Sequence, residues 1–254
     1  MMLAIDIGNS NTVLGLYDGA RLQRHWRLVT EPARTADEYG FLLRSLLGES
    51  TGSGLAGVAV ASVVPAMTGT IATVCHDYLG LAPLFVGPGI KTGMAILYDD
   101  PRQLGADRIV NAVAAYERTH AATIVVDLGT ATKFEYISAD GEYIGGVIAP
   151  GVGIASDALF ARAALLSRVE LSQPSQVVGR NTMTAIQSGL FYGYVAMIDG
   201  LVARIQRECG VTARIIATGG FSSLLAPASA TIDEVDEFLT LDGIRLIYKR
   251  NAMN

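Results

Sequence analysis

Apolar positions along the chain alternate between short β-type runs and longer helical stretches. Continuous or alternating apolar runs predict strands, and apolar residues spaced three or four apart predict helices. The predicted strands cover residues 2–7, 11–17, 22–29, 56–63, 122–127, 132–138, 143–148, 213–217 and 244–248. The predicted helices cover residues 36–48, 66–79, 101–119, 153–166 and 180–208. Strands followed by helices, twice over, indicate an α/β fold with two lobes.

The boundary between these lobes is expected near Thr119 to Ala122. It gives an N-terminal lobe of residues 1–119 and a C-terminal lobe of residues 120–254. No Gly/Ser-rich or Pro-rich linker separates them, so we expect the lobes to pack closely around a cleft and to hinge slightly.

One sequence pattern occurs twice, about half a chain length apart. The first copy runs from Leu3 to Tyr17 and contains Asp6-Ile-Gly-Asn-Ser-Asn-Thr. The second runs from Thr123 to Tyr136 and contains Asp127-Leu-Gly-Thr-Ala-Thr-Lys. Each copy is an apolar strand, then Asp-apolar-Gly with small polar residues, then a second strand-like run. This repetition predicts two similar lobes.

Both copies have the chemistry of a phosphate-binding turn. Glycine permits a close approach of the backbone to a ligand, and short hydroxyl or amide side chains stand beside backbone N–H groups. An aspartate at the strand end places a carboxylate near a phosphate-bound Mg²⁺ or its water shell. For a single copy, an ordinary hairpin turn explains the pattern better. The matched pair favours two turns that hold a triphosphate.

A third segment carries possible acid–base chemistry at the start of a predicted helix. It reads Gly105-Ala-Asp107-Arg108 and follows Tyr98 and Pro101. A carboxylate and a guanidinium at such a junction could act as general base and as carboxylate clamp. Alternatively, Asp107 caps the helix and Arg108 is solvated. Spacing alone does not decide between these two interpretations.

Two glycine-rich connections and two lysines are weaker candidates. Pro150-Gly-Val-Gly153 enters a predicted helix and could bind an anion, and Thr218-Gly-Gly220 ends a predicted strand where a nucleotide could lie. Each is equally well explained as a tight turn. Lys91 and Lys133 are possible phosphate ligands, although an isolated lysine is usually a surface residue. The chain has neither a P-loop nor the protein-kinase motif set.

Composition narrows the function classes. The chain has 19 basic and 24 acidic residues and a net charge of −5, without a basic block, so a nucleic-acid partner is not expected. No uninterrupted apolar stretch has the length of a membrane span, and the N-terminus has no signal-peptide pattern. The two cysteines and three histidines are scattered, which argues against a metal cluster and fits a cytoplasmic protein.

Together these segments resemble the type III pantothenate kinase family, within the acetate kinase, sugar kinase and actin superfamily. The resemblance extends along nearly the whole chain. Gly105-Ala-Asp-Arg108 in its setting is the most specific segment, whereas the Asp-x-Gly turns alone indicate only the superfamily. The supporting stretches are Asp6 to Asn11, Leu104 to Ala112, Asp127 to Thr132, Gly146 to Gly151, Val178 to Thr182, Gln187 to Gly193 and Ala217 to Gly220.

The resemblance implies a fold of two similar ribonuclease H-like lobes with an ATP cleft between them. It also implies ATP-dependent phosphorylation of pantothenate to 4'-phosphopantothenate, the first step of coenzyme A biosynthesis. Family members are homodimers in which the helical face around Thr182 helps to close the substrate site. The implied partners are therefore ATP, pantothenate and a second copy of the chain, with no nucleic acid and no membrane.

The resemblance also assigns roles to individual residues. Asp107 matches the proton acceptor, Asp6 lies near Mg²⁺ through the phosphates, and Asp127 matches the ligand of a monovalent cation, K⁺ or NH₄⁺. The implied ATP contacts are Asp6, Ile7, Gly8, Asn9, Ser10, Asn11, Thr12, Val13 and Thr130. The implied pantothenate contacts are Tyr98, Gly105, Ala106, Asp107, Arg108 and Thr182.

The chain departs from the family pattern just after the second turn. Lys133-Phe-Glu135 stands where Thr-Phe-Asp is typical, and Ser10 replaces a common threonine. A positive charge at residue 133 could change cation dependence or phosphate affinity.

Two other functions are compatible with the sequence. One is a different small-molecule kinase, or a phosphatase, on the same fold. The other is a non-enzymatic regulatory accessory factor. The intact Asp6, Asp107 and Asp127 argue against a loss of catalysis.

Overall fold

A computed structural model describes residues 1–48, 54–162 and 168–252. The chain forms two compact units. The first comprises Met1–Ala114 and Leu239–Asn254, and the second comprises Ala115–Phe238. The lobes expected from the sequence were residues 1–119 and 120–254. In the structure, the C-terminal segment from Leu239 belongs to the first unit instead. The cleft expected between the lobes stays a prediction.

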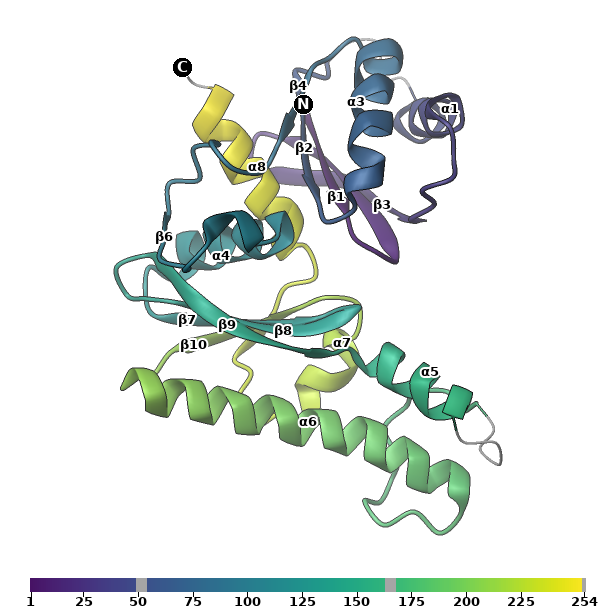
Figure 1. Cartoon of the computed structure of the whole chain (residues 1–254), viewed down its shortest axis with the longest axis vertical. Helices are drawn as coiled ribbons and strands as arrows, with labels where there is room; N and C mark the ends of the chain where they lie inside the picture. The colour runs from purple at the N-terminus through teal and green to yellow at the C-terminus, as the bar shows by residue number, and fades with distance from the viewer. Residues whose placement is uncertain (49–53, 163–167, 253–254) are drawn as a thin grey trace. The chain divides into compact units, whose positions relative to one another are not determined.

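The first unit is built on a mixed sheet with the strand order β3-β2-β1-β4-β5 (Figure 1). β1 pairs antiparallel with β2 and parallel with β4. The strands are β1 (Met2–Ile7), β2 (Asn11–Asp18), β3 (Arg21–Val29), β4 (Gly57–Ser62) and β5 (Pro83–Phe85). A short strand, β6 (Ala95–Ile96), follows them in the chain.

Helices of the first unit pack on both faces of this sheet. On one face, Leu3, Ile5 and Ile7 of β1 are fully buried against α1 and α3. On the other face α8 comes so close that a Cβ at Gly15 would meet Leu241 Cδ1 at 2.9 Å. The helices are α1 (Ala36–Leu47), α3 (Pro65–Leu79), the 3₁₀ turn η1 (Pro101–Gln103), α4 (Ala106–Thr119, which continues into the second unit) and α8 (Leu239–Ala252).

The predicted strand at residues 244–248 was wrong, because these residues lie inside α8. Leu241, Ile244 and Ile247 are buried at a spacing of three residues along one side of the helix. A short apolar run with Gly243 just before it does not distinguish a strand from a buried helix. The glycine is required by packing, since a Cβ there would collide with the Val110 carbonyl.

The second unit repeats the strand arrangement of the first. Its sheet has the order β11-β10-β7-β8-β9, in which β7 pairs antiparallel with β8 and parallel with β10. Thus β9-β8-β7-β10-β11 corresponds strand for strand to β3-β2-β1-β4-β5, which confirms the predicted α/β fold with two similar halves. The strands are β7 (Thr123–Leu128), β8 (Ala131–Ile137), β9 (Glu142–Pro150), β10 (Arg214–Thr218) and β11 (Glu234–Val235).

The long helix α6 (Thr182–Cys209) lies along one face of this sheet (Figure 1). Its residues Phe191, Ile198 and Val202 are fully buried against the apolar face of β7, β8 and β10. By length and composition α6 could cross a membrane, although these contacts are those of a core helix. The other helices are α5 (Val152–Arg162), α7 (Ser222–Leu225) and the 3₁₀ turn η2 (Ala226–Ala228).

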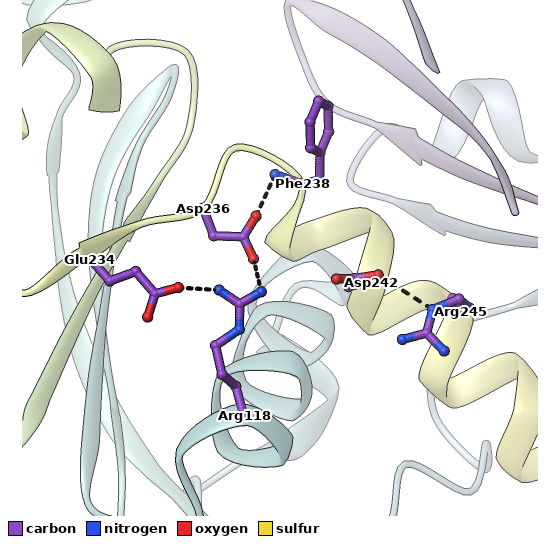
Figure 2. A network of polar contacts seen from close by, with 6 residues as sticks. All are labelled: Arg118, Glu234, Asp236, Phe238, Asp242 and Arg245. Atoms are coloured by element: carbon purple, nitrogen blue, oxygen red, sulfur yellow. Dashed lines mark hydrogen bonds and ion pairs between the residues drawn. The ribbon is translucent and has the colours of Figure 1, made fainter. Parts of the chain in front are cut away.

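Charged side chains fasten the edge strand of the second unit (Figure 2). Arg118, near the end of α4, contacts Glu234 at 2.5 Å and Asp236 at 2.7 Å. Asp236 in turn accepts a hydrogen bond of 2.9 Å from the Phe238 N–H. These contacts hold β11 and the turn that follows it.

The remaining predicted elements agree with the structure, apart from a few ends. Residues 163–166 of the predicted helix 153–166 lie outside the described residues. The predicted helix 101–119 is divided into η1 and α4 at Leu104 and Gly105. β5, β6, α7, η2 and β11 were not predicted, and each is four residues or shorter. Such short elements contain too few residues to show a period.

Candidate active site

The first Asp-x-Gly turn connects β1 to β2 and is fastened by a buried threonine. The Gly8 N–H donates to the Asn11 carbonyl at 3.0 Å and so closes the turn. Thr30 donates through its hydroxyl to the Gly8 carbonyl at 2.7 Å and contacts the Thr12 hydroxyl at 3.0 Å. Its N–H also donates to the Ser10 carbonyl. The turn therefore has a defined backbone conformation before any ligand binds.

The second turn, between β7 and β8, is closed in the same way. The Gly129 N–H donates to the Ala131 carbonyl at 3.1 Å. The Thr130 carbonyl accepts from the Gly151 N–H at 3.1 Å, and a Cβ at Gly151 would collide with that carbonyl. Thr130 itself is exposed. Within the Pro150–Gly153 connection, glycine at position 151 is therefore required by packing against this turn.

Asp6 and Asp127 occupy equivalent positions at the two turns. Each is the second-to-last residue of its strand and is half-buried. The residue opposite Asp6 is Val13, whereas the residue opposite Asp127 is Lys133. Within its own unit, each aspartate lies on the sheet face opposite the principal helical core.

The Lys133 ammonium forms an ion pair with Asp127. Nζ lies 2.7 Å from Asp127 Oδ2, and the two side chains are only 14% and 13% exposed. The other carboxylate oxygen, Oδ1, is close to backbone, since a Cβ at Gly219 would lie 2.6 Å from it and one at Gly129 would lie 3.3 Å from it. Gly219 also has a φ of +92°, which favours glycine.

Glu135 follows Lys133 on the same face of β8. It is 1% exposed and accepts a hydrogen bond from the Tyr143 hydroxyl of β9. Gly146, which pairs with Glu135 across β8 and β9, leaves room for the carboxylate: a Cβ there would lie 2.9 Å from Oε2. This buried carboxylate is thus held within the second sheet.

In the first unit, Asp107 lies in the first turn of α4. The helix begins after Gly105, whose carbonyl accepts the N–H groups of Arg108 and Ile109. Asp107 Oδ1 accepts the Arg108 N–H at 2.8 Å. A Cβ at Gly105 would lie 2.5 Å from this oxygen, so glycine is needed there.

Arg108 is buried rather than solvated. It is 6% exposed, and its guanidinium carbon lies 5.5 Å from the centre of the Tyr98 ring. Stacking on an aromatic ring orients the planar guanidinium, which can bind a carboxylate through two parallel hydrogen bonds. The alternative of a solvated Arg108 was therefore wrong, and Asp107 is a first-turn residue rather than the residue that precedes the helix.

Thr182 lies in the second unit, as the first residue of α6. Asn181 caps this helix by accepting the Thr184 N–H at 2.9 Å. Thr182 is exposed and lines an open groove of about 650 Å³ between α5 and α6. The groove is lined by Leu159, Gly179, Arg180, Asn181, Thr182, Ala185, Ile186, Gly189 and Leu190.

The structure thus brings Tyr98, Gly105, Asp107 and Arg108 together in one unit. Residues 6–13 form one turn of the same unit, while Thr130 and Asp127 form the second turn in the other. Sequence reasoning missed Thr30, because a threonine at the end of a strand carries no pattern that indicates its long-range partner. It flagged Gly219 and Lys133, but without their contacts to Asp127.

Among the described residues, no three His, Cys, Asp or Glu side chains gather in a way that could hold a metal ion. Magnesium bound through nucleotide phosphates needs only one or two carboxylates, so Asp6 suits that role. A monovalent cation on Asp127 fits less well. One carboxylate oxygen already holds an ammonium, and that ammonium would repel a second cation beside it.

Comparison with known proteins identifies the family. The family described as type III pantothenate kinase matches residues 2–204. The chain belongs to the type III pantothenate kinase family. It is 54% identical to the type III pantothenate kinase of Pelobacter propionicus, over 99% of this chain and 100% of that protein. It is 52% identical to that of Geobacter sulfurreducens, over 99% of each chain.

This member of the type III pantothenate kinase family shares its fold with several solved structures. A putative Baf family transcriptional activator from Campylobacter jejuni has a TM-score of 0.60 at 20% identity, covering 98% of both chains. A putative 2-dehydro-3-deoxygalactonokinase from Sinorhizobium meliloti has a TM-score of 0.59 at 12% identity, covering 100% of both. These likenesses support the actin and sugar kinase type of fold with two sheets.

Proposed function

We propose that the chain transfers the γ-phosphoryl group of ATP to the primary hydroxyl of pantothenate, which gives 4'-phosphopantothenate in the first step of coenzyme A biosynthesis. The observation that carries this proposal is the cluster at the start of α4. There a buried Arg108 stacked on Tyr98 stands next to Asp107. Pantothenate has a carboxylate at one end, which a cationic side chain can bind. It has a hydroxyl at the other end, which needs a proton acceptor.

In this proposal Asp107 accepts the proton of the hydroxyl while the oxygen attacks the γ-phosphorus. The carboxylate is held in place by the Arg108 N–H and by the close packing of Gly105. Arg108 binds the carboxylate of pantothenate, with Tyr98 holding the guanidinium plane. Gly105, Ala106 and Thr182 complete the proposed substrate contacts, as the resemblance implies.

ATP and a divalent metal ion are the cofactors of this kinase family. We assign the nucleotide contacts to residues 6–13 and to Thr130, on turns that their own hydrogen bonds hold in shape. Mg²⁺ would supply charge neutralisation on the phosphates, and Asp6 would orient it or its water shell. Preformed turns reduce the ordering that accompanies nucleotide binding, and positioning with charge stabilisation provides most of the catalysis in phosphoryl transfer.

The experiment that tests the function is an ADP-release assay on the purified chain with Mg²⁺ and ATP. Pantothenate is compared with a panel of sugars and with acetate, and the product is identified by mass. We expect ADP release with pantothenate and none above background with the other acceptors. Release with a sugar instead would support another kinase of the superfamily, and no release with any acceptor would support a non-enzymatic role.

Arg108→Lys is expected to raise KM for pantothenate by about 10- to 100-fold, because the lysine lacks the planar fork that binds a carboxylate twice. KM for ATP should stay unchanged. The matched control is Arg102→Lys, since Arg102 precedes α4 and its side chain is 81% exposed. Steady-state kinetics in both substrates measures the effect. An unchanged KM for pantothenate would contradict the clamp.

The chain is also proposed to form a homodimer through the face around Thr182. This face is unusually apolar for a surface: Val177, Val178 and Met183 are 64%, 79% and 54% exposed. Sedimentation equilibrium should give twice the chain mass of 26.8 kDa. Val178→Asp should lower the dimer fraction, because it places a charge in a buried apolar contact. A monomeric wild-type chain would contradict this part of the proposal.

A cytoplasmic location accompanies the proposed function. Cys75 is buried and Cys209 is half-buried, and neither forms a disulfide. Burial raises the pKa of the Cys75 thiol to about 12, so this thiol stays protonated and unreactive in the folded chain.

A further inference from the structure

The two halves of the protein differ at one position that lies directly beside the turn aspartate. β1–β2 and β7–β8 have the same pairing, and Val13 and Lys133 are the residues opposite Asp6 and Asp127. The residue opposite Asp6 is thus uncharged and cannot form an ion pair with it across the two strands. In the second half, a lysine neutralises the corresponding carboxylate at 2.7 Å.

The geometry around Asp127 determines what this carboxylate can still bind. Oδ2 holds the Lys133 ammonium. On the other side, backbone at Gly129 and Gly219 is close enough to Oδ1 that an added Cβ would lie within 3.3 Å and 2.6 Å of it. Both charged side chains are more than four-fifths buried, so water screens their attraction only weakly. A free monovalent cation on this carboxylate would have to displace the ammonium or lie beside it.

We infer that the ammonium group of Lys133 takes the place of a free monovalent cation at the second phosphate turn, so that this kinase does not require K⁺ or NH₄⁺. This inference rests on the proposed function. The Lys133 side chain ends in the same chemical group as an ammonium ion, and its position is set by Asp127. Because it is part of the chain, it does not have to be recruited from solution.

The pair also fits the chemistry of the turn that it adjoins. Thr130 is exposed beside backbone N–H groups, an arrangement that suits a phosphate oxygen. The Lys133 ammonium adds positive charge near that turn, and its ion pair with Asp127 holds it there. Lys133 therefore acts as a positioning residue of the second turn.

The first test measures the activity of the wild-type chain in three buffers. One is potassium-free, with tetramethylammonium as the only added monovalent cation, and the other two contain KCl or NH₄Cl in addition. We expect equal kcat and KM for ATP in all three. Strong activation by K⁺ or NH₄⁺ would overturn the inference while leaving the proposed function intact. No phosphorylation of pantothenate in any buffer would contradict the proposed function instead, and the binding measurement below then decides about the cation.

The second test creates the missing cation requirement. In Lys133→Thr, we expect activity in tetramethylammonium buffer to fall by about 10- to 100-fold, as for the loss of a charge-assisted contact. KCl or NH₄Cl should restore much of it. Lys249→Thr is the matched control, since Lys249 is exposed on α8 and its loss should change neither activity nor cation response. A Lys133→Thr chain with wild-type kinetics in every buffer would contradict the inference.

Direct binding provides a readout that does not depend on catalysis. ²⁰⁵Tl⁺, a mimic of K⁺, is titrated against both folded proteins and its NMR line width is measured. We expect broadening by Lys133→Thr and none by the wild type. Broadening by the wild type that Asp127→Asn abolishes would show a cation on Asp127 and overturn the inference. Circular dichroism confirms that each variant is folded.

Discussion

Asp107→Asn is expected to lower kcat for pantothenate phosphorylation by about 10²- to 10⁴-fold, the usual contribution of a general base. The asparagine keeps an oxygen that can accept the Arg108 N–H, which Asp107 Oδ1 accepts at 2.8 Å. The start of α4 should therefore keep its conformation. What the variant loses is the carboxylate that takes the proton, so the change should appear in kcat and not in the affinity for ATP.

Stopped-flow or steady-state ADP release measures this effect, and a titration with a fluorescent ATP analogue measures nucleotide binding. Asp99→Asn is the matched control, because Asp99 is exposed in the same segment and has no assigned role. Wild-type turnover in Asp107→Asn would exclude Asp107 as the base. A loss of nucleotide binding together with turnover would assign it to the ATP site instead.

Phe191→Ala is expected to lower the free energy of unfolding by about 3–5 kcal/mol, the usual cost of removing a buried aromatic ring. Phe191 is fully buried at the centre of the core between α6 and the second sheet. Its ring also meets Tyr192 edge to face, with centroids 5.1 Å apart. Alanine would leave a cavity that neighbouring side chains fill only in part.

Urea denaturation followed by far-UV circular dichroism measures this loss, and we expect the midpoint to fall by about 1 M or more. Phe41→Ala provides the matched control, since Phe41 is 77% exposed on α1 and its removal should leave the midpoint almost unchanged. If Phe191→Ala unfolded at the wild-type midpoint, the assignment of α6 as a core helix would be wrong.

Local patterns in the sequence were sufficient to predict most of the long strands of both sheets. The strands at 2–7 and 11–17 and their counterparts at 122–127 and 132–138 are bounded by Asp-x-Gly turns, so their ends were clear. The run at 244–248 was different. Its apolar residues fit a strand or a helix, and packing of α8 against the first sheet decided for the helix.

For the site residues too, the sequence predicted some features, and others depended on tertiary contacts. Asp107 and Arg108 were recognisable as a pair at a loop–helix junction. Their spacing did not show whether Arg108 is solvated or binds a carboxylate. Burial to 6% exposure and the stack on Tyr98 decided that question. Thr30, which fastens the first turn, was not predicted because its partners are about 20 residues away along the chain.

The sequence by itself determined the repeated turn, the two-lobed α/β fold and the family, because each depends on residues that are close together in the chain. The tertiary structure decided that Asp127 forms an ion pair with the lysine on the neighbouring strand. Lys133 was visible in the sequence as a departure from the family pattern, yet its effect depended on the register of β7 and β8. That register places its ammonium on Asp127, because residues paired across antiparallel strands project from the same face.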